Sequence, residues 1–279
     1  MEYKPVGLAG LLAGDQSALD TLHDELKAQG WCILVLPEGF QSQVSGLMKG
    51  SKEFFDKNLT YKKTFAHPPR YGYVSTDYKE ALRLLTGSLS EGMTLPKEVQ
   101  QKPTDSAPHG NNDGDLLTIC KTLDEIAKTI IYLTSKKIFG VEPGELGEKK
   151  LVPLLLPHNT LRSSPVGYGM LDIVHYLPGK RTQDGDVVAP HGDPGLFSLS
   201  LLSTAPGLEL LHTPSGNWIP VPLDAGVLWC GATATEVTSG LIPAGWHRVL
   251  PTYEVRATPP PSNNNTKELK TNPHKREAG

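Results

Sequence analysis

Residues 190–202 read Pro-His-Gly-Asp-Pro-Gly-Leu-Phe-Ser-Leu-Ser-Leu-Leu, which sets a histidine and an aspartate two positions apart at the start of an apolar run. Residues i and i+2 of an extended chain project to the same side, so the His191 imidazole and the Asp193 carboxylate can bind one metal ion together. The alternative is a plain turn in which Asp193 caps backbone amides. The triplet by itself leaves both interpretations open.

The same stretch belongs to a series of short β runs in the second half of the chain. Turn residues separate these runs, such as Pro-Gly at 206–207, Pro-Ser-Gly-Asn at 214–217 and Asp-Ala-Gly at 224–226. Many short strands with such separators are typical of a β-sandwich or a jelly-roll barrel. The expected strands span residues 170–177, 196–202, 208–212, 218–221, 227–230, 246–250 and 253–257.

Helical patterns dominate the part of the chain before these strands. Apolar residues at helical spacing predict helices over 15–29, about 42–55 and 116–139, and a strand is expected at 31–36. The helix over 116–139 has the longest apolar stripe, which suits a helix that braces a sheet. The predicted class is therefore α+β: a β-sandwich or a jelly-roll barrel, flanked by N-terminal helices and a bracing helix.

Three regions follow from this interpretation. Residues 1–110 are expected to form a helical and strand region that packs on the barrel, and residues 111–258 to form the bracing helix and the jelly-roll core. Residues 259–279 contain prolines, asparagines and lysines with almost nothing apolar to bury, which predicts a mobile tail.

Composition excludes several classes of protein. The formal net charge is −3 at pH 7, so there is no electrostatic reason to expect a binder of nucleic acid or of an anionic membrane. No apolar run approaches the roughly 18 residues of a membrane span. The 3 cysteines are far apart, which favours neither a disulfide framework nor a thiolate zinc site. We expect a soluble, cytoplasmic protein, with a monomer as the default.

A second histidine changes the weight of the metal interpretation. The stretch Trp-His-Arg-Val at 246–249 lies within the last expected strands. Two histidines and one carboxylate, brought together by a β-barrel, form the facial triad that binds ferrous iron and leaves coordination positions open. Farther along, Arg256 and Thr258 would face the same way on a strand, offering a guanidinium fork and a hydroxyl to one carboxylate.

With these motifs in this order, the chain resembles the isopenicillin N synthase-like branch of the ferrous iron and 2-oxoglutarate-dependent dioxygenases. That family carries His-x-Asp, a distal His usually followed by Arg-Val, and then Arg-x-Ser, where this chain has Arg256-Ala-Thr258. The resemblance covers about residues 5–258 and includes Gly-Trp-Cys-Ile-Leu-Val at 30–35 and Tyr-Gly-Tyr at 71–73.

The resemblance implies that the core is a double-stranded β-helix of the jelly-roll or cupin type. It also implies an iron(II) site and two cosubstrates. His191, Asp193 and His247 would bind the metal, Arg256 and Thr258 would bind the far carboxylate of 2-oxoglutarate, and O2 would be the second cosubstrate. Decarboxylation of 2-oxoglutarate to succinate would then accompany hydroxylation, desaturation or ring closure at an unactivated C–H bond of the substrate.

Two departures from the family pattern affect the cosubstrate site. Where the family usually has Asn-Tyr-Tyr-Pro, residues 175–178 read His-Tyr-Leu-Pro. His175 is therefore expected to take the role of the asparagine in cosubstrate binding, and Leu177 replaces a tyrosine that often contacts the keto acid. The family's Asn-x-Gly-Asp is replaced by Trp-Cys-Gly-Ala at 229–232.

Residues of the substrate pocket are expected from the same resemblance. Two arginines beside tyrosines suit a small-molecule substrate that bears carboxylates, whereas solvated surface residues or ordinary core residues are the alternative. The candidates are Arg70, Tyr73, Arg83, Phe197 and Trp229.

Three functional hypotheses remain open. The first is a 2-oxoglutarate-dependent dioxygenase that acts on a small specialised metabolite or an amino-acid derivative. The second is an iron(II) oxidase of the same fold that does not use 2-oxoglutarate. The third is a catalytically silent jelly-roll binding protein. Enzymes that act on very different substrates share this fold, so the fold alone cannot choose the substrate.

Overall fold

In the computed structural model, residues 3–67, 71–85, 94–100, 116–139, 169–177 and 187–251 are described. Their strands are β1 (Val6–Gly7), β2 (Trp31–Val35), β3 (Ala66–His67), β4 (Tyr71–Ser75), β5 (Lys79–Leu85), β6 (Met170–Tyr176), β7 (Val188–His191), β8 (Phe197–Ser200), β9 (Leu208–His212), β10 (Asn217–Pro220), β11 (Gly226–Cys230) and β12 (His247–Val249). Their helices are α1 (Leu8–Leu12), α2 (Gln16–Gln29), α3 (Glu38–Phe55), α4 (Leu59–Lys63), the 3₁₀ helix η1 (Lys97–Val99), α5 (Leu116–Phe139) and α8 (Ala232–Val237).

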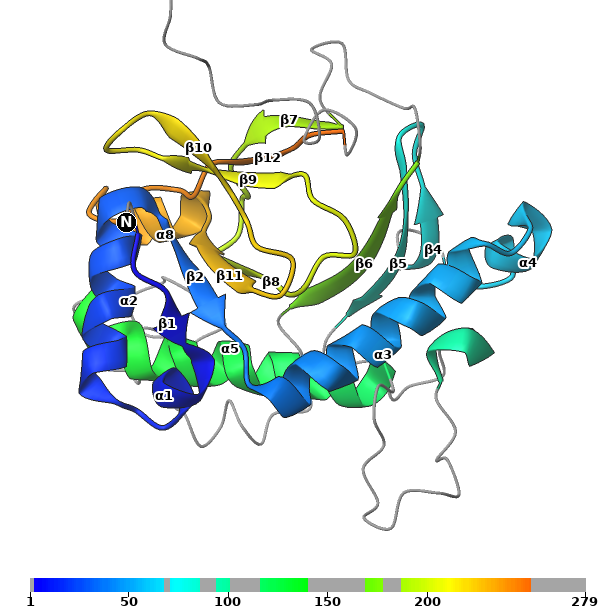
Figure 1. Cartoon of the computed structure of the whole chain (residues 1–279), viewed down its shortest axis with the longest axis horizontal. Helices are drawn as coiled ribbons and strands as arrows, with labels where there is room; N and C mark the ends of the chain where they lie inside the picture. The colour runs from blue at the N-terminus through cyan, green and yellow to red at the C-terminus, as the bar shows by residue number, and fades with distance from the viewer. Residues whose placement is uncertain are drawn as a thin grey trace, which may run out of the picture.

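The strands form three sheets of four, in the orders β1-β2-β11-β8, β10-β9-β12-β7 and β3-β4-β5-β6. Figure 1 shows the first and third sheets above the long helices, with the second sheet on the opposite side of the barrel. Apart from the parallel β1–β2 pair, all these strand pairs are antiparallel. The jelly-roll type of core expected from the run of short strands suits this arrangement.

The N-terminal helix and strand follow from local sequence signals. The Asp15 carboxylate accepts a hydrogen bond from the Ala18 amide at 2.8 Å and caps α2. Gly30 has φ +79° and ends the helix in a left-handed conformation that favours glycine. The chain then enters β2, which pairs with β11 so that Trp31 lies opposite Trp229. A strand from the N-terminal region is thus part of a core sheet.

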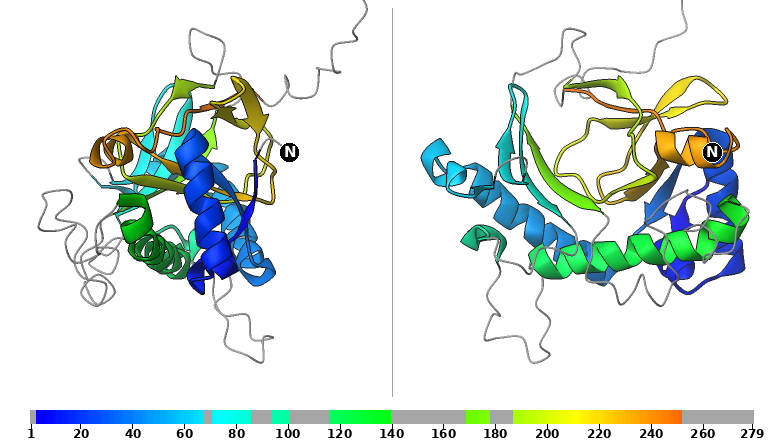
Figure 2. Two further views of the ribbon diagram at one scale, coloured as in Figure 1. Left: turned by 90° about the vertical axis from the view of Figure 1, so that its left-hand side faces the viewer. Right: turned by 180° about the vertical axis from the view of Figure 1, so that it is seen from behind.

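Helices cover one side of the barrel. Figure 2 shows α5 running along the outer side of the sheets, with α2 crossing one end. The α5 stripe divides between two apolar clusters: Ile126 and Ile130 pack with Leu34 and Leu228, and Ile119 lies in a second cluster around α3. A third cluster fills the inside of the barrel and contains Trp31, Ile33, Leu210, Val227 and Trp229. The inside of the barrel is therefore packed beside the functional residues described below.

Most predicted elements are present, but one helix begins earlier than predicted and several further elements were not predicted. Helix α3 begins at Glu38 rather than near residue 42, because Pro37 precedes its first turn as the N-cap residue. The elements that were not predicted are strands β1, β3, β4, β5 and β7 and helices α1, α4, η1 and α8. In β5, the run from Lys79 to Leu85 mixes charged residues with apolar ones and hides the strand. Cys32, Cys120 and Cys230 are free and buried. None of the helices in the described ranges has the length and apolar character of a membrane-spanning segment.

Candidate metal centre

Two histidines face each other across neighbouring antiparallel strands. His191 at the end of β7 lies directly opposite His247 at the start of β12, and their ring centroids are 4.2 Å apart. Nδ1 of His191 is 2.9 Å from the carbonyl oxygen of Ala189, and Nδ1 of His247 is 3.2 Å from that of Gly245. A carbonyl oxygen only accepts, so each Nδ1 carries the proton and each Nε2 keeps a free lone pair.

The Asp193 carboxylate completes the group. Its Oδ1 atom lies 3.9 Å from Nε2 of His191 and 3.9 Å from Nε2 of His247. One donor atom from each of the three residues lies within 4.8 Å of the others. Two imidazole nitrogens and one carboxylate oxygen on one side of a site suit a divalent transition metal such as iron(II). The residues present therefore fit the metal that the sequence predicts.

Asp193 is anchored by donors on its other oxygen. Oδ2 accepts hydrogen bonds from the Ser198 hydroxyl and from the Trp229 indole nitrogen, the latter at 2.8 Å. Burial opposes ionisation of Asp193, but these two hydrogen bonds, together with the charges of His247 and His191, lower the pKa of the carboxyl group. Burial lowers the pKa of His247, which is 6 % exposed. Both shifts favour the protonation states that bind metal.

A close backbone contact holds the loop that carries Asp193. The Ala232 amide donates to the Asp193 carbonyl oxygen at 2.8 Å, and the Gly231 amide donates to the Leu196 carbonyl oxygen at 3.1 Å. A Cβ atom at Gly231 would overlap the Gly195 carbonyl oxygen and lie 2.6 Å from that of Asp193. Glycine is required here because β11 and the Asp193 loop approach each other too closely for a side chain.

We expect Gly231→Ala to lower the free energy of unfolding by about 1–3 kcal/mol, the usual range for overpacking. The matched control is Gly39→Ala in α3, where an added Cβ would meet nothing within 4 Å. Urea unfolding followed by circular dichroism measures both changes. Equal stability of the Gly231 variant and the wild-type protein would contradict the close contact.

Tyr176 is a residue near this group that the sequence analysis did not single out. Burial raises the pKa of Tyr176 to about 12, and the charges of Tyr78, Asp172 and Asp193 add to the shift. The phenol therefore stays protonated near neutral pH. The alternation of side chains along β6 could have indicated this position. Ile173 packs in the helix-side core, so Tyr176, three residues later, must project to the other face of the sheet.

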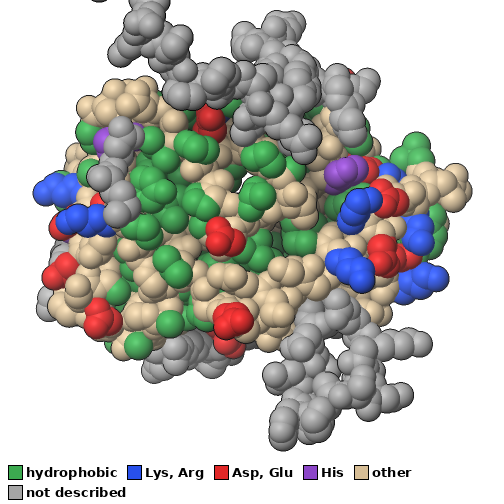
Figure 3. Space-filling view, in the orientation of Figure 1, with side chains coloured by type: hydrophobic (Ala, Val, Ile, Leu, Met, Phe, Trp, Pro, Cys, Tyr) green, Lys and Arg blue, Asp and Glu red, His purple; other side chains and the backbone are tan. Residues whose placement is uncertain are grey.

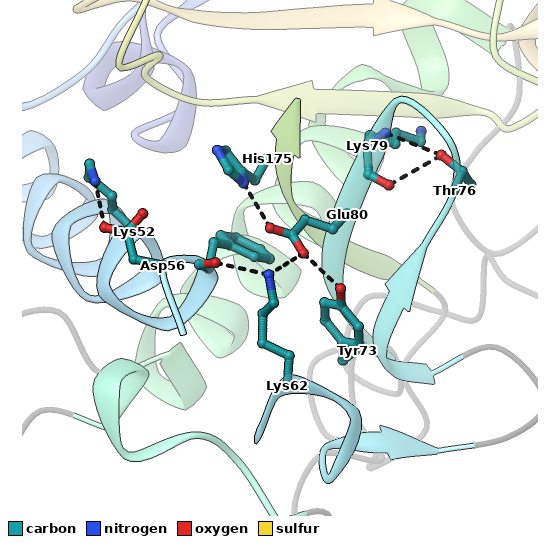
Figure 4. Close-up of polar contacts among 9 residues, drawn as sticks. Lys52, Asp56, Lys62, Tyr73, Thr76, Lys79, Glu80 and His175 are labelled. Atoms are coloured by element: carbon teal, nitrogen blue, oxygen red, sulfur yellow. Dashed lines mark hydrogen bonds and ion pairs between the residues drawn. The ribbon is translucent and has the colours of Figure 1, made fainter. Parts of the chain in front are cut away.

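His175 lies on the helix side of the same strand. Its Nδ1 atom is 3.0 Å from Oε1 of Glu80, and its ring stacks on Phe55 with centroids 5.2 Å apart. Figure 4 shows His175, Lys62 and Tyr73 converging on the Glu80 carboxylate. The structure does not bring His175 to the triad, so this placement does not favour the predicted cosubstrate role, which remains a prediction.

The predicted substrate residues occupy different surroundings. Tyr73 is 5 % exposed in the helix-side core, where its hydroxyl donates to Glu80 at 2.7 Å. Arg83 forms a two-bond ion pair with Asp172, at 2.7 Å and 2.6 Å. Phe197 lies opposite Cys230 and packs against the α2 and α5 cluster. Trp229 contacts both Asp193 and His247. A substrate role for these four residues remains a prediction.

The remaining predicted residues, Arg70, Arg256 and Thr258, lie outside the described residues, as does the expected strand at 253–257. Their proposed roles depend on the sequence pattern alone. The role of Ser198 was not predicted, although its place directly opposite Trp229 on β8 and β11 puts both side chains on the face that Asp193 reaches.

Comparisons with known proteins agree with this centre. Residues 168–258 match the family model described as the 2OG-Fe(II) oxygenase superfamily. This match spans β6 to β12, and with them all three residues of the triad. No curated protein sequence matches the chain.

Several solved structures share the fold. The chain has a TM-score of 0.61 and 18% identity to a protein of Shewanella oneidensis described as an oxygenase, covering 90% of this chain and 83% of that one. A full-length Neurospora crassa protein in complex with alpha-KG has a TM-score of 0.57 and 19% identity to the chain, covering 94% of this chain and 79% of that one. Dioxygenase for auxin oxidation 1 of Arabidopsis thaliana, in a binary complex with 2-oxoglutarate, has a TM-score of 0.61 and 15% identity to the chain. The match covers 89% of this chain and 86% of that one.

These findings confirm the family resemblance drawn from the sequence. Residues 168–258 match the model of the 2OG-Fe(II) oxygenase superfamily, with which the isopenicillin N synthase-like description is compatible. The family of that model uses iron(II), 2-oxoglutarate and O2, in agreement with the cofactors that the sequence predicts. The group of His191, Asp193 and His247 that could bind iron(II) is present in the structure.

Proposed function

We propose that this chain binds iron(II) through His191, Asp193 and His247 and oxidises a C–H bond of a small molecule at the expense of 2-oxoglutarate and O2. The convergence of the three donor atoms within 4.8 Å supports this proposal most directly. The substrate we propose is a small specialised metabolite or an amino-acid derivative, and the oxidation is a hydroxylation, a desaturation or a ring closure. Arg256 and Thr258 would bind the far carboxylate of 2-oxoglutarate.

Bound iron would supply the activation of O2 that couples decarboxylation of 2-oxoglutarate to oxidation of the substrate. The protein's own residues prepare the site for this chemistry. The carbonyl oxygens of Ala189 and Gly245 fix both imidazoles with Nε2 turned inward. The buried ring of His247 limits the access of water on its side. The protonated Tyr176 phenol offers a hydrogen-bond donor near Asp193.

The Arg83–Asp172 ion pair bears on the substrate. Both side chains are about one-fifth exposed, at 22% and 21%, and the guanidinium charge is balanced by the carboxylate. A paired Arg83 offers less attraction to a substrate carboxylate than a free one would. Recognition of a substrate carboxylate by Arg83 would therefore require that Asp172 release at least one of its two hydrogen bonds from the Arg83 guanidinium group.

The 2-oxoglutarate assignment is tested by Arg256→Ala. Loss of a guanidinium–carboxylate interaction of about 1.5–3 kcal/mol should raise the apparent dissociation constant of 2-oxoglutarate by about 10- to 100-fold. The measurement is succinate formation by the iron-loaded protein at graded 2-oxoglutarate concentrations. Arg256→Lys keeps the charge but not the fork, so we expect an intermediate value.

The alternative, an iron(II) oxidase without 2-oxoglutarate, is favoured by one observation. Leu177 stands where the resembled family usually has a tyrosine that contacts the keto acid. If the wild-type protein binds iron(II) but its affinity for 2-oxoglutarate is negligible and unchanged by Arg256→Ala, this alternative replaces the first proposal.

A further inference from the structure

The two oxygens of the Asp193 carboxylate have different surroundings. Oδ1 is the atom that lies 3.9 Å from Nε2 of each histidine. Oδ2 faces the other way and accepts hydrogen bonds from the Ser198 hydroxyl and, at 2.8 Å, from the Trp229 indole nitrogen. One oxygen is thus directed at the metal position, and the other is held by two donors from the protein.

The sheet fixes both donors before any metal binds. Ser198 on β8 and Trp229 on β11 are directly opposite each other in the antiparallel register, so their side chains project from the same face. β11 is also hydrogen-bonded to β2 on its other edge, which makes it an inner strand. The Ala232 amide holds the Asp193 backbone from the segment that follows β11. The Asp193 carboxylate is therefore hydrogen-bonded to side chains whose backbone is fixed by the sheet.

The chemistry of the indole suits a positioning role. Its N–H group can only donate, so Trp229 can neither bind a metal ion nor accept a proton. The ring is 7% exposed, and its centroid lies 4.6 Å from that of His247 with an interplanar angle of 38°. Trp229 consequently contacts two of the three candidate ligands through different parts of one rigid side chain.

We propose that Trp229, together with Ser198, is a positioning residue that holds Asp193 as a one-oxygen ligand by occupying Oδ2 and turning Oδ1 toward the metal. This inference rests on the proposed function, because it requires a metal ion at the triad. A carboxylate that keeps one oxygen out of the coordination shell leaves a further position open for cosubstrates. The role is distinct from the substrate contact predicted for Trp229.

The test removes the N–H donor while keeping an aromatic ring. In Trp229→Phe, the dissociation constant of anaerobically added iron(II) should rise by about 10- to 100-fold, the usual effect of losing an outer-shell partner of a metal ligand. Ser198→Ala should act in the same direction, and Ser198→Thr, which keeps the hydroxyl, should restore most of the affinity. The matched control is Trp218→Phe. Trp218 lies on β10 and stacks under the guanidinium group of Arg248, and it is not hydrogen-bonded to Asp193.

A second step separates action through Asp193 from a general structural effect. When Asp193→Ala has already removed the carboxylate, adding Trp229→Phe should change the remaining iron(II) affinity less than twofold. An equal loss in both backgrounds would overturn the inference, and so would Trp229→Phe and Ser198→Ala variants that bind iron(II) as tightly as the wild-type protein. If the wild-type protein itself binds no iron(II), the proposed function fails first. If the wild-type protein binds iron(II), and replacing His191 or His247 weakens this binding while Trp229→Phe and Ser198→Ala do not, the inference alone fails.

Discussion

The His247→Ala variant is expected to lose iron(II) binding and 2-oxoglutarate turnover. His247 is the most buried of the three side chains, and its Nδ1 atom faces the Gly245 carbonyl oxygen, so Nε2 is the atom that it offers to a metal ion. Loss of a direct ligand should exceed the roughly 10- to 100-fold effect of losing an outer-shell partner. We therefore expect the iron(II) dissociation constant to rise by more than about 100-fold, measured by anaerobic equilibrium dialysis.

His212→Ala is the matched control for this experiment. His212 is a histidine in the neighbouring strand β9. Its Nδ1 atom lies 2.7 Å from the Ser215 hydroxyl, and it is not one of the three grouped donors. Its replacement should leave iron(II) affinity and succinate formation at wild-type levels. If His247→Ala bound iron(II) with wild-type affinity, the metal site would have to lie elsewhere. Loss of both properties in the His212 variant would show that histidine replacement acts unspecifically.

The Glu80→Ala variant is expected to be strongly destabilised. Nζ of Lys62 lies 2.6 Å from Oε2 of Glu80, and the side chains are only 11% and 5% exposed. Burial opposes ionisation of Glu80, but the hydrogen bonds from Lys62, His175 and Tyr73 lower the pKa of Glu80. Removal of the carboxylate would leave a buried ammonium group without its partner, which typically lowers the free energy of unfolding by about 3–5 kcal/mol.

Lys52→Ala provides the comparison, because Lys52 and Asp56 form an exposed ion pair on α3 at 2.6 Å. Figure 3 shows charged side chains of both signs mixed over the region of α3 and α4, where such pairs contribute little. Urea unfolding should show a large loss for Glu80→Ala and no measurable change for Lys52→Ala. Equal stability of the two variants would mean that the buried pair does not hold α4 to the sheet.

The stability supplied by Glu80 should also depend on pH. Its folded pKa is lower than its ordinary value of 4.5, so the unfolded chain takes up a proton first as the pH falls. The contribution is therefore present above pH 4.5 and lost progressively below it. This loss accompanies the Glu80→Ala prediction, since the variant should lack that part of the acid sensitivity.

Local sequence signals predicted much of the fold. The apolar stripe of α5 predicts a helix over the residues it occupies, and Gly30 marks the end of α2. Strand β9 coincides with its predicted range of 208–212. These elements carry regular apolar spacing or a clear stop signal, and both are properties of neighbouring residues. Strand β5 lacks such a pattern because its charged residues Glu80 and Arg83 find partners in the tertiary contacts Lys62–Glu80 and Arg83–Asp172.

The candidate site was predicted less completely than the fold. The spacing of His191 and Asp193, and the distal His247, was sufficient to bring the triad into consideration. The face on which a side chain projects depends on strand register, which one sequence does not specify. The structure places Tyr73 in the helix-side cluster and His175 beside Glu80 and Phe55, and their roles at the substrate and the cosubstrate stay predictions. The same reason explains why the contact of Ser198 with Asp193 was not foreseen.

The most direct test of the account is an anaerobic titration of the metal-free protein with iron(II) and then with 2-oxoglutarate. We expect iron(II) to bind first, and 2-oxoglutarate then to produce the weak visible charge-transfer absorption of a metal-bound keto acid. Both signals should be absent in His247→Ala, and the second should weaken in Arg256→Ala. Iron(II) binding without this absorption would favour the oxidase that does not use 2-oxoglutarate. Failure of the wild-type protein to bind iron(II) would contradict the account and leave a catalytically silent binding protein.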